Sequence, residues 1–272
     1  MATFTEKMRR LDRIRLTLKR KFGDQPKPMV THPVEHALRT ILAEEAGQAQ
    51  VEDAIGRMRA QFADWNDLRV SRPREIRETL GSDFPRRGHK ARVIPRLLDQ
   101  VFKHHNSMVC DFLETMGKVE TRAYFESLEE VRPFVAATLA RDCAGAHAFP
   151  VDHDVARVLG RLGILDPDEQ SDVEMQAYLE RGVKSTRAYE VHQLVRRLAE
   201  KLCLVEEPLC RRCPLKDGCP SAMLAPKKKA KKKTAPKRKR KKARRKAPKK
   251  APKRRKKRTA KGRKRTARAK KK

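Results

Sequence analysis

Four cysteines lie close together near residue 210 of the 272-residue chain, with the spacing C-x6-C-x2-C-x5-C. They are Cys203, Cys210, Cys213 and Cys219. Thiolate sulfur is the usual ligand of iron–sulfur clusters and a common ligand of zinc. Structural zinc sites usually have two short cysteine pairs separated by a longer insert, whereas only Cys210 and Cys213 form such a pair here. The spacing therefore favours a [4Fe-4S] cluster over a zinc ion, and either metal over disulfide bonds.

A second segment, FPVDHDVARVLGRLG at 149–163, lies upstream of these cysteines. Together the two segments resemble endonuclease III and its relatives, the helix-hairpin-helix (HhH-GPD) DNA glycosylases of base-excision repair. The resemblance implies a [4Fe-4S] cluster on the four cysteines, and it puts Asp152 at the position of the catalytic aspartate. A carboxylate there would stabilise positive charge on the deoxyribose and help to activate the nucleophile. The local sequence leaves open that Asp152 or Asp154 only caps the following helix, since aspartate is a preferred N-cap.

The hairpin of this family, approximately Leu-Pro-Gly-Val-Gly-x-Lys-Thr-Ala, corresponds to LEEVRPFVA at residues 128–136. Both glycines, whose backbone N–H groups approach a DNA phosphate in the family, are replaced. Glu129 and Glu130 place carboxylates where phosphate would bind, and Pro133 has no N–H. Phe134 occupies the position of the lysine that forms a Schiff base with the sugar. A phenyl ring has no nucleophilic atom, so a lyase reaction through residue 134 is excluded.

A further departure concerns the turn that fills the gap left by a flipped base in the family. Residues 43–45 of this chain are Ala-Glu-Glu, and DNA phosphates would repel an inserted glutamate. Lys90 and its neighbours match a helix start of the family only weakly. The resemblance extends over about residues 8–222 and is strongest at 149–163 and 203–219.

Hydrophobic residues repeat with the helical period in several places. The i, i+3, i+4, i+7 spacing predicts helices around 34–42, 94–102, 155–162 and 191–198. Pro33 suits the first turn of one of these helices, and Gly163 suits the end of another. No run with a period of two, bounded by turn residues, stands out. The fold class is therefore all-α, with loops at 22–32, around 84–89, at 144–151 and at 203–220.

Charge is distributed very unevenly along the chain. Residues 226–272 hold 31 of the 68 lysines and arginines and no acidic residue, which leaves 37 basic and 34 acidic residues and a net charge of +3 in residues 1–225. A segment with no apolar side chains and strong self-repulsion is expected to be disordered. It resembles the tails of linker histones and bacterial histone-like proteins, although a solubilising or ribosome-adherent tail is the alternative.

A polycation of this density is expected to bind nucleic acid independently of sequence, through phosphate contacts. Double-stranded DNA is the expected partner, and RNA is the alternative. The tail residues that we expect to contact phosphates are Lys237, Arg238, Lys239, Arg240, Arg244, Arg245, Lys253, Arg254 and Arg255. In the cysteine loop, Arg211, Arg212 and Lys216 are the candidate contacts, with an ordinary solvated basic surface as the alternative.

The remaining features concern the compartment. The N-terminal residues carry charges throughout, which is untypical of a signal peptide, and no apolar run is long enough to cross a membrane. Cys110 and Cys143 are isolated, as buried thiols usually are. These features predict an intracellular, reducing location, cytoplasmic or associated with the nucleoid, without a membrane partner. We expect a monomer.

The resemblance implies a two-lobed HhH-GPD glycosylase fold. Residues 1–29 and 141–222 would form one lobe with the cluster loop at 203–219, and 30–140 the other lobe, ending in a degenerate hairpin at about 124–140. Residues 223–272 would form the disordered basic tail. The function that the resemblance implies is removal of a damaged or mismatched base without lyase activity. The alternatives are a DNA-binding or redox-sensing relative without catalysis, and a histone-like architectural protein.

Overall fold

The computed structural model describes residues 2–27 and 29–223, and this part of the chain is helical without any strand. The all-α fold class predicted from the sequence is confirmed. No helix among these residues is long and apolar enough to cross a membrane. The helices are α1 Phe4–Phe22, α2 Pro33–Leu42, α3 Gln48–Gln61, α4 Trp65–Val70, α5 Pro73–Leu80, α6 Arg87–His105, α7 Phe112–Thr115, α8 Lys118–Ser127, α9 Pro133–Ala144, α10 His153–Arg161, α11 Asp172–Gly182 and α12 Ser185–Lys201, followed by the short 3-10 turns η1 Cys210–Arg212 and η2 Lys216–Gly218.

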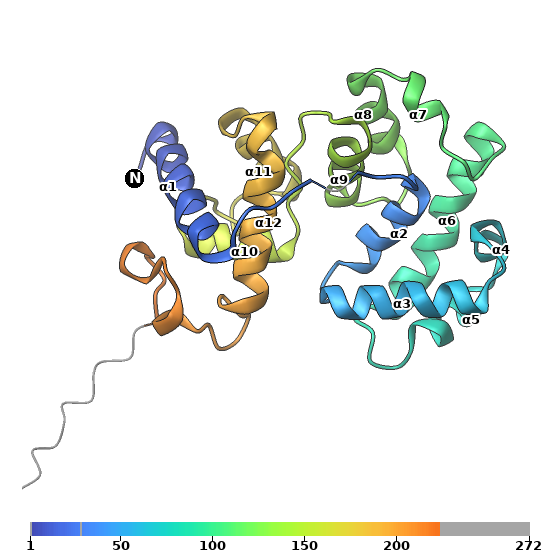
Figure 1. Ribbon diagram of the computed structural model, residues 1–272, viewed down its shortest axis with the longest axis horizontal. Helices are drawn as coiled ribbons and strands as arrows, with labels where there is room; N and C mark the ends of the chain where they lie inside the picture. The colour runs from blue at the N-terminus through green and yellow to red at the C-terminus, as the bar shows by residue number, and fades with distance from the viewer. Residues whose placement is uncertain (1, 28, 224–272) are drawn as a thin grey trace, which may run out of the picture. The chain divides into compact units, whose positions relative to one another are not determined.

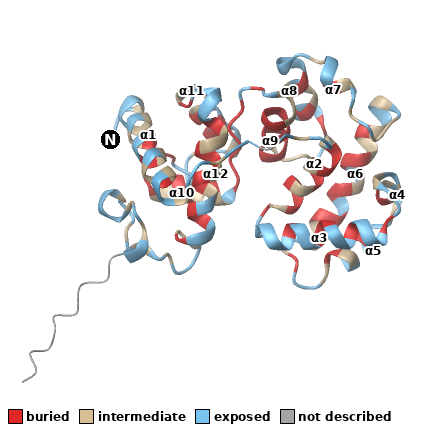
Figure 2. Cartoon of the chain, in the orientation of Figure 1, coloured by how far each residue is buried: buried red, intermediate tan, exposed pale blue. Residues whose placement is uncertain are grey.

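The buried hydrophobic residues form two clusters. One joins α2 to α9 and runs from Val34 to Ala146. The other joins α1 to α10, α11 and α12, and it draws on residues 11–18 and 149–202. Figure 1 shows the two corresponding groups of helices, and Figure 2 shows that the buried faces point into each group. The chain thus passes twice between the groups, through residues 23–32 and 145–152. The exact domain boundaries given above stay a prediction.

Local sequence signals account for several helix ends. Pro33 begins α2 and Pro133 begins α9, positions where a missing N–H costs nothing. Gly163 follows α10 in the left-handed region, with φ +68°. One predicted loop ends earlier than expected: residues 84–86 form a turn, and α6 already begins at Arg87. A left-handed Arg86 (φ 50°) makes the turn into that helix, and the sequence gives no sign of this.

The predicted hairpin is present as two helices and a tight turn. Helix α8 ends at Ser127 and α9 begins at Pro133, so residues 128–132 form the connection. Leu128 is buried, and Phe134 is only 1% exposed within the α2–α9 cluster. These apolar side chains keep the hairpin shape although the glycines of the family are absent.

Candidate functional site

Asp152 lies where the chain enters the helix α10. Its Oδ1 accepts a hydrogen bond from the backbone N–H of Val155 at 2.7 Å, so the side chain caps the helix as expected for an N-cap aspartate. Capping uses only one oxygen. The other, Oδ2, lies 3.4 Å from Nε of Arg196 on α12. The residue is 7% exposed, and burial raises the pKa of Asp152 while the Arg196 charge opposes this rise.

A small recess opens beside this carboxylate. It is lined by Glu44, Glu45, Arg132, Phe134, Asp152, His153 and Asp154. Two of the places where this chain differs from the family, the glutamates at 44–45 and the phenyl ring at 134, therefore lie in one recess with Asp152. It has room for about one water molecule, which is far too little for a nucleobase.

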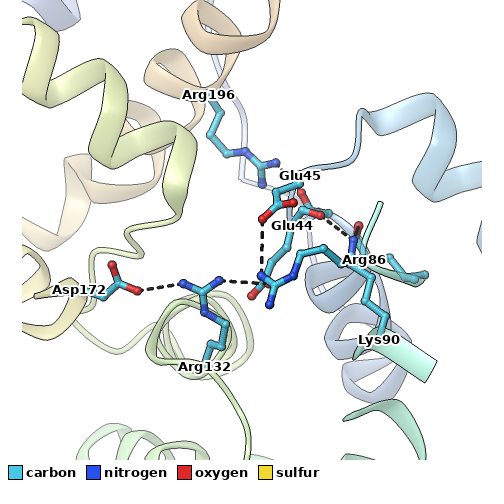
Figure 3. A network of polar contacts seen from close by, with 9 residues as sticks. Glu44, Glu45, Arg86, Lys90, Arg132, Asp172 and Arg196 are labelled. Carbon is cyan, nitrogen blue, oxygen red and sulfur yellow. Dashed lines mark hydrogen bonds and ion pairs between the residues drawn. The ribbon is translucent and has the colours of Figure 1, made fainter. Parts of the chain in front are cut away.

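Ion pairs from several helices meet at the residues that line the recess. Arg132, directly before α9, lies between Glu44 (Nη1 to Oε2, 3.4 Å) and Asp172 at the start of α11 (Nη2 to Oδ2, 2.9 Å), as Figure 3 shows. Glu44 is also 3.8 Å from Arg86, whose guanidinium is 3.5 Å from Glu45. The pair between Arg132 and Asp172 joins the two groups of helices. The negative charges of Glu44 and Glu45 are therefore partly neutralised by arginines, which reduces the repulsion of DNA phosphates expected from the sequence.

Lys90 of α6 binds the backbone of the turn that carries Glu44 and Glu45. Its Nζ donates to the carbonyl oxygens of Leu42 at 2.9 Å and Glu44 at 2.5 Å, and it lies 4.7 Å from the centre of the Phe84 ring. The residue is 1% exposed, and burial lowers the pKa of Lys90 to about 8. In the sequence, Lys90 and its neighbours match a helix start of the family only weakly. Nothing in its local pattern distinguishes a buried lysine from a solvated one.

Side chains of α6 hold the turn of the hairpin. The backbone N–H of Glu129 donates to Oε1 of Gln100 at 2.7 Å, and the Gln100 side-chain amide donates to the Glu129 carbonyl at 3.0 Å. Glu130, at the first glycine position, has φ 61° and pairs with Arg96. A glutamate thus adopts the left-handed conformation that favours glycine, at a cost of about 1 kcal/mol. The Glu129 amide is thus bonded to Gln100, and Pro133 has no N–H to offer.

The four cysteines meet at one small pocket. Cys203, Cys210, Cys213 and Cys219 all line it, together with apolar side chains that include Leu162, Leu198, Leu202 and Pro208. Burial raises the pKa of Cys213 and Cys219, and the neighbouring thiols raise it further. In residues 2–27 and 29–223, no three His, Cys, Asp or Glu side chains are arranged to hold a single metal ion.

Arginines of α10 hold the loop that carries these cysteines. Arg157 donates to the carbonyl oxygen of Cys203, and its guanidinium also lies 2.5 Å from Asp154. Arg161 donates to the carbonyls of Leu204 at 2.6 Å and Val205 at 2.7 Å. The cysteine loop and the Asp152 region are therefore attached to the same helix.

The chain resembles two curated proteins over part of its length. No protein-family model matches the chain. Among curated proteins, endonuclease III of Sulfolobus acidocaldarius is 24% identical over 98 residues, which are 36% of this chain and 44% of that protein. DNA glycosylase/AP lyase ROS1 of Arabidopsis thaliana is 27% identical over 183 residues, covering 57% of this chain and 12% of that protein. The chain thus spans less than half the length of these curated relatives.

Solved structures match this chain over a larger share of its length and identify its fold. A trapped covalent intermediate of endonuclease III with DNA superposes with a TM-score of 0.64 and 20% identity, over 82% of this chain and 98% of that chain. The chain has the endonuclease III fold. The likeness inferred from the cysteine spacing and the segment at 149–163 is therefore confirmed at the level of the fold.

Within the endonuclease III fold, the structure brings together only part of the predicted site. Asp152 and Phe134 line one recess, and the four cysteines line one pocket. Arg211, Arg212 and Lys216 are exposed on the cysteine loop and pair with no acidic side chain of the described residues. The predicted tail contacts, Lys237 to Arg255, lie outside the described residues. The contacts that Arg132, Arg196 and Lys90 make at this site could not be predicted from the sequence, because they join distant segments.

Proposed function

We propose that the protein binds DNA and removes a damaged or mismatched base by hydrolysis, without Schiff-base lyase activity. The observation that carries this proposal is Asp152. Its Oδ2 is free of the helix cap and lines a recess at the position that corresponds to the catalytic aspartate of endonuclease III. No amine is available at residue 134, since Phe134 fills that position.

The chemistry expected of this carboxylate is electrostatic. Cleavage of an N-glycosidic bond develops positive charge on the sugar, and an ionised Asp152 beside it would lower the barrier. The water-sized recess next to Asp152 suits a water nucleophile, whose proton the carboxylate would accept as the water attacks the anomeric carbon. A flipped nucleotide requires the recess to open. Breaking the ion pair between Arg132 and Asp172 is the motion that would open it.

We also propose that the four cysteines hold a [4Fe-4S] cluster. All four thiols line one pocket with apolar walls, as a buried cluster requires. The spacing of the four cysteines, in which only Cys210 and Cys213 form a short pair, supports a cluster rather than a zinc ion. The cluster would tie the end of α12 to α10 through Cys203 and the arginines that hold its loop.

DNA is the proposed partner for two reasons. The endonuclease III structures that match this fold are DNA complexes, and residues 226–272 carry 31 basic side chains. Arg211, Arg212 and Lys216 would add contacts from the cysteine loop. The location that fits these features is intracellular, on the nucleoid.

A second candidate function is DNA binding without catalysis, and two observations favour it. The recess beside Asp152 does not admit a base in this structure, and Glu130 and Arg132 stand where the hairpin of the family has its glycines. Base release separates the two candidates. A panel of duplexes with damaged or mismatched bases is incubated with the full-length protein, and alkali is added afterwards to cut at abasic sites. The proposed function predicts cleavage only after alkali on at least one duplex, and the second candidate predicts none.

A further inference from the structure

Arg196 is the residue of α12 that faces Asp152. Its side chain is 25% exposed, and its Nε lies 3.4 Å from Oδ2 of Asp152. On its other side, Nη2 donates to the carbonyl oxygen of Ala43 at 3.2 Å. Figure 3 shows this guanidinium at the turn that carries Glu44 and Glu45. Arg196 thus has an ion-pair partner in one group of helices and a hydrogen-bond acceptor in the other.

We propose that Arg196 is a positioning residue, which holds the Asp152 carboxylate ionised and aimed at the recess. This inference rests on the proposed function for its catalytic meaning, but its electrostatic part concerns only the folded protein. The ion pair with Asp152 and the hydrogen bond to Ala43 restrain the guanidinium plane from two sides. The carboxylate is likewise fixed on two sides, by Val155 N–H at Oδ1 and by Arg196 at Oδ2.

The charges around Asp152 explain why one cation matters there. The titratable and charged groups that face it are Arg196 from α12, His153 and Asp154 from its own helix, and Glu44, Glu45 and Arg132 across the recess. Three of these are carboxylates, which favour a protonated neighbour. Arg132 is already shared between Glu44 and Asp172. Of the described side chains, Arg196 is the one cation at ion-pair distance from Asp152.

An ionised Asp152 is a requirement of the chemistry. A protonated carboxyl group neither stabilises a positive sugar nor accepts a proton from water. If Arg196 acted only as a tie between the helix groups, its loss would reduce folding stability and activity equally at every pH. If it keeps Asp152 ionised, its loss displaces the titration of that carboxyl group to higher pH.

The test is a carbon NMR titration of full-length protein labelled with 13Cγ-aspartate, in which the Asp152 signal is assigned by its absence from Asp152→Asn. In Arg196→Gln the titration midpoint of Asp152 should move to higher pH than in the wild type. Arg196→Lys should restore most of the difference, because it keeps the charge. Arg197→Gln is the matched control, since Arg197 is an exposed neighbour on the same helix and should leave the midpoint unchanged. An unchanged midpoint in folded Arg196→Gln would overturn the proposal.

A second arm measures base release. At pH values below the titration midpoint of Asp152 in the variant, Arg196→Gln should release base more slowly than the wild type, because a smaller fraction of Asp152 is ionised, and it should recover at higher pH. A loss that is equal at every pH would overturn the positioning role. If the wild type releases no base at all, the proposed function fails while the NMR titration still decides the role of Arg196.

Discussion

Phe134 stands where the family that this chain resembles has a lysine. Its ring would prevent the Schiff-base lyase reaction but not hydrolytic base removal. It is 1% exposed and lines the recess beside Asp152. An imine with an abasic sugar requires a nucleophilic nitrogen, which this position lacks. We therefore predict that a protein ending at residue 225 forms no borohydride-stable adduct with abasic DNA. The full-length chain is the comparison, since exposed tail amines should trap weakly. A strong adduct with the shortened protein would show that another lysine acts as nucleophile.

Lys90 gives a second prediction at the scale of one residue, and it concerns pH. The pKa of Lys90 is lowered from 10.5 to about 8 in the folded protein. Between these values the unfolded chain binds more protons than the folded chain, so the free energy of unfolding should rise with pH from about 8 to 10.5, by roughly 3 kcal/mol. Lys90→Met should be less stable at pH 7, because two carbonyls lose their donor, and should lack this rise. Chemical denaturation across this pH range measures both. Parallel pH curves for the two proteins would contradict the assignment.

At the scale of elements, the sequence predicted the helices better than the contacts between them. The apolar repeats at 34–42 and 191–198 correspond to α2 and α12, because amphipathic periodicity is local information. The sequence placed Asp152 at a helix start and could not choose between capping and catalysis. In the structure Oδ1 caps the helix and Oδ2 pairs with Arg196, and the catalytic role of Asp152 stays a prediction. The link from Arg132 to Asp172 joins positions 40 residues apart, and periodicity carries no information about such pairs.

The cysteine loop is the element whose stability should depend most on metal. Wild-type protein purified without oxygen should be brown, with about four irons per chain. Cys213→Ser should lose the colour and most of the soluble yield, because metal binding and folding of such a loop are coupled. Cys143→Ser is the control, since Cys143 lies outside the cysteine pocket and belongs to the other cluster of helices. Stoichiometric zinc without iron in the wild type would contradict the cluster.

At the scale of the whole molecule, we expect the basic tail to supply most of the affinity for undamaged DNA, and the nearly neutral body to supply little of it. If about 10 tail charges engage phosphates together, the slope of log affinity against log salt should be near −9. Removing residues 226–272 should flatten this slope and weaken binding to undamaged duplex by orders of magnitude, while the helical circular dichroism spectrum stays the same. Fluorescence anisotropy over a range of salt concentrations measures the slope. An unchanged slope after truncation would assign the phosphate contacts to the body.

We propose above that this chain removes bases through Asp152, although it has neither the lysine nor the hairpin glycines of the family that it resembles. Single-turnover base release, on the duplex that the wild type processes best, tests it most directly. Asp152→Asn should lower the rate by about 10²–10³. Asp154→Asn should have a smaller effect, since Asp154 pairs with Arg157. Wild-type strands should remain intact until alkali is added. Equal release by the wild type and Asp152→Asn, or strong strand cleavage without alkali, would contradict the account.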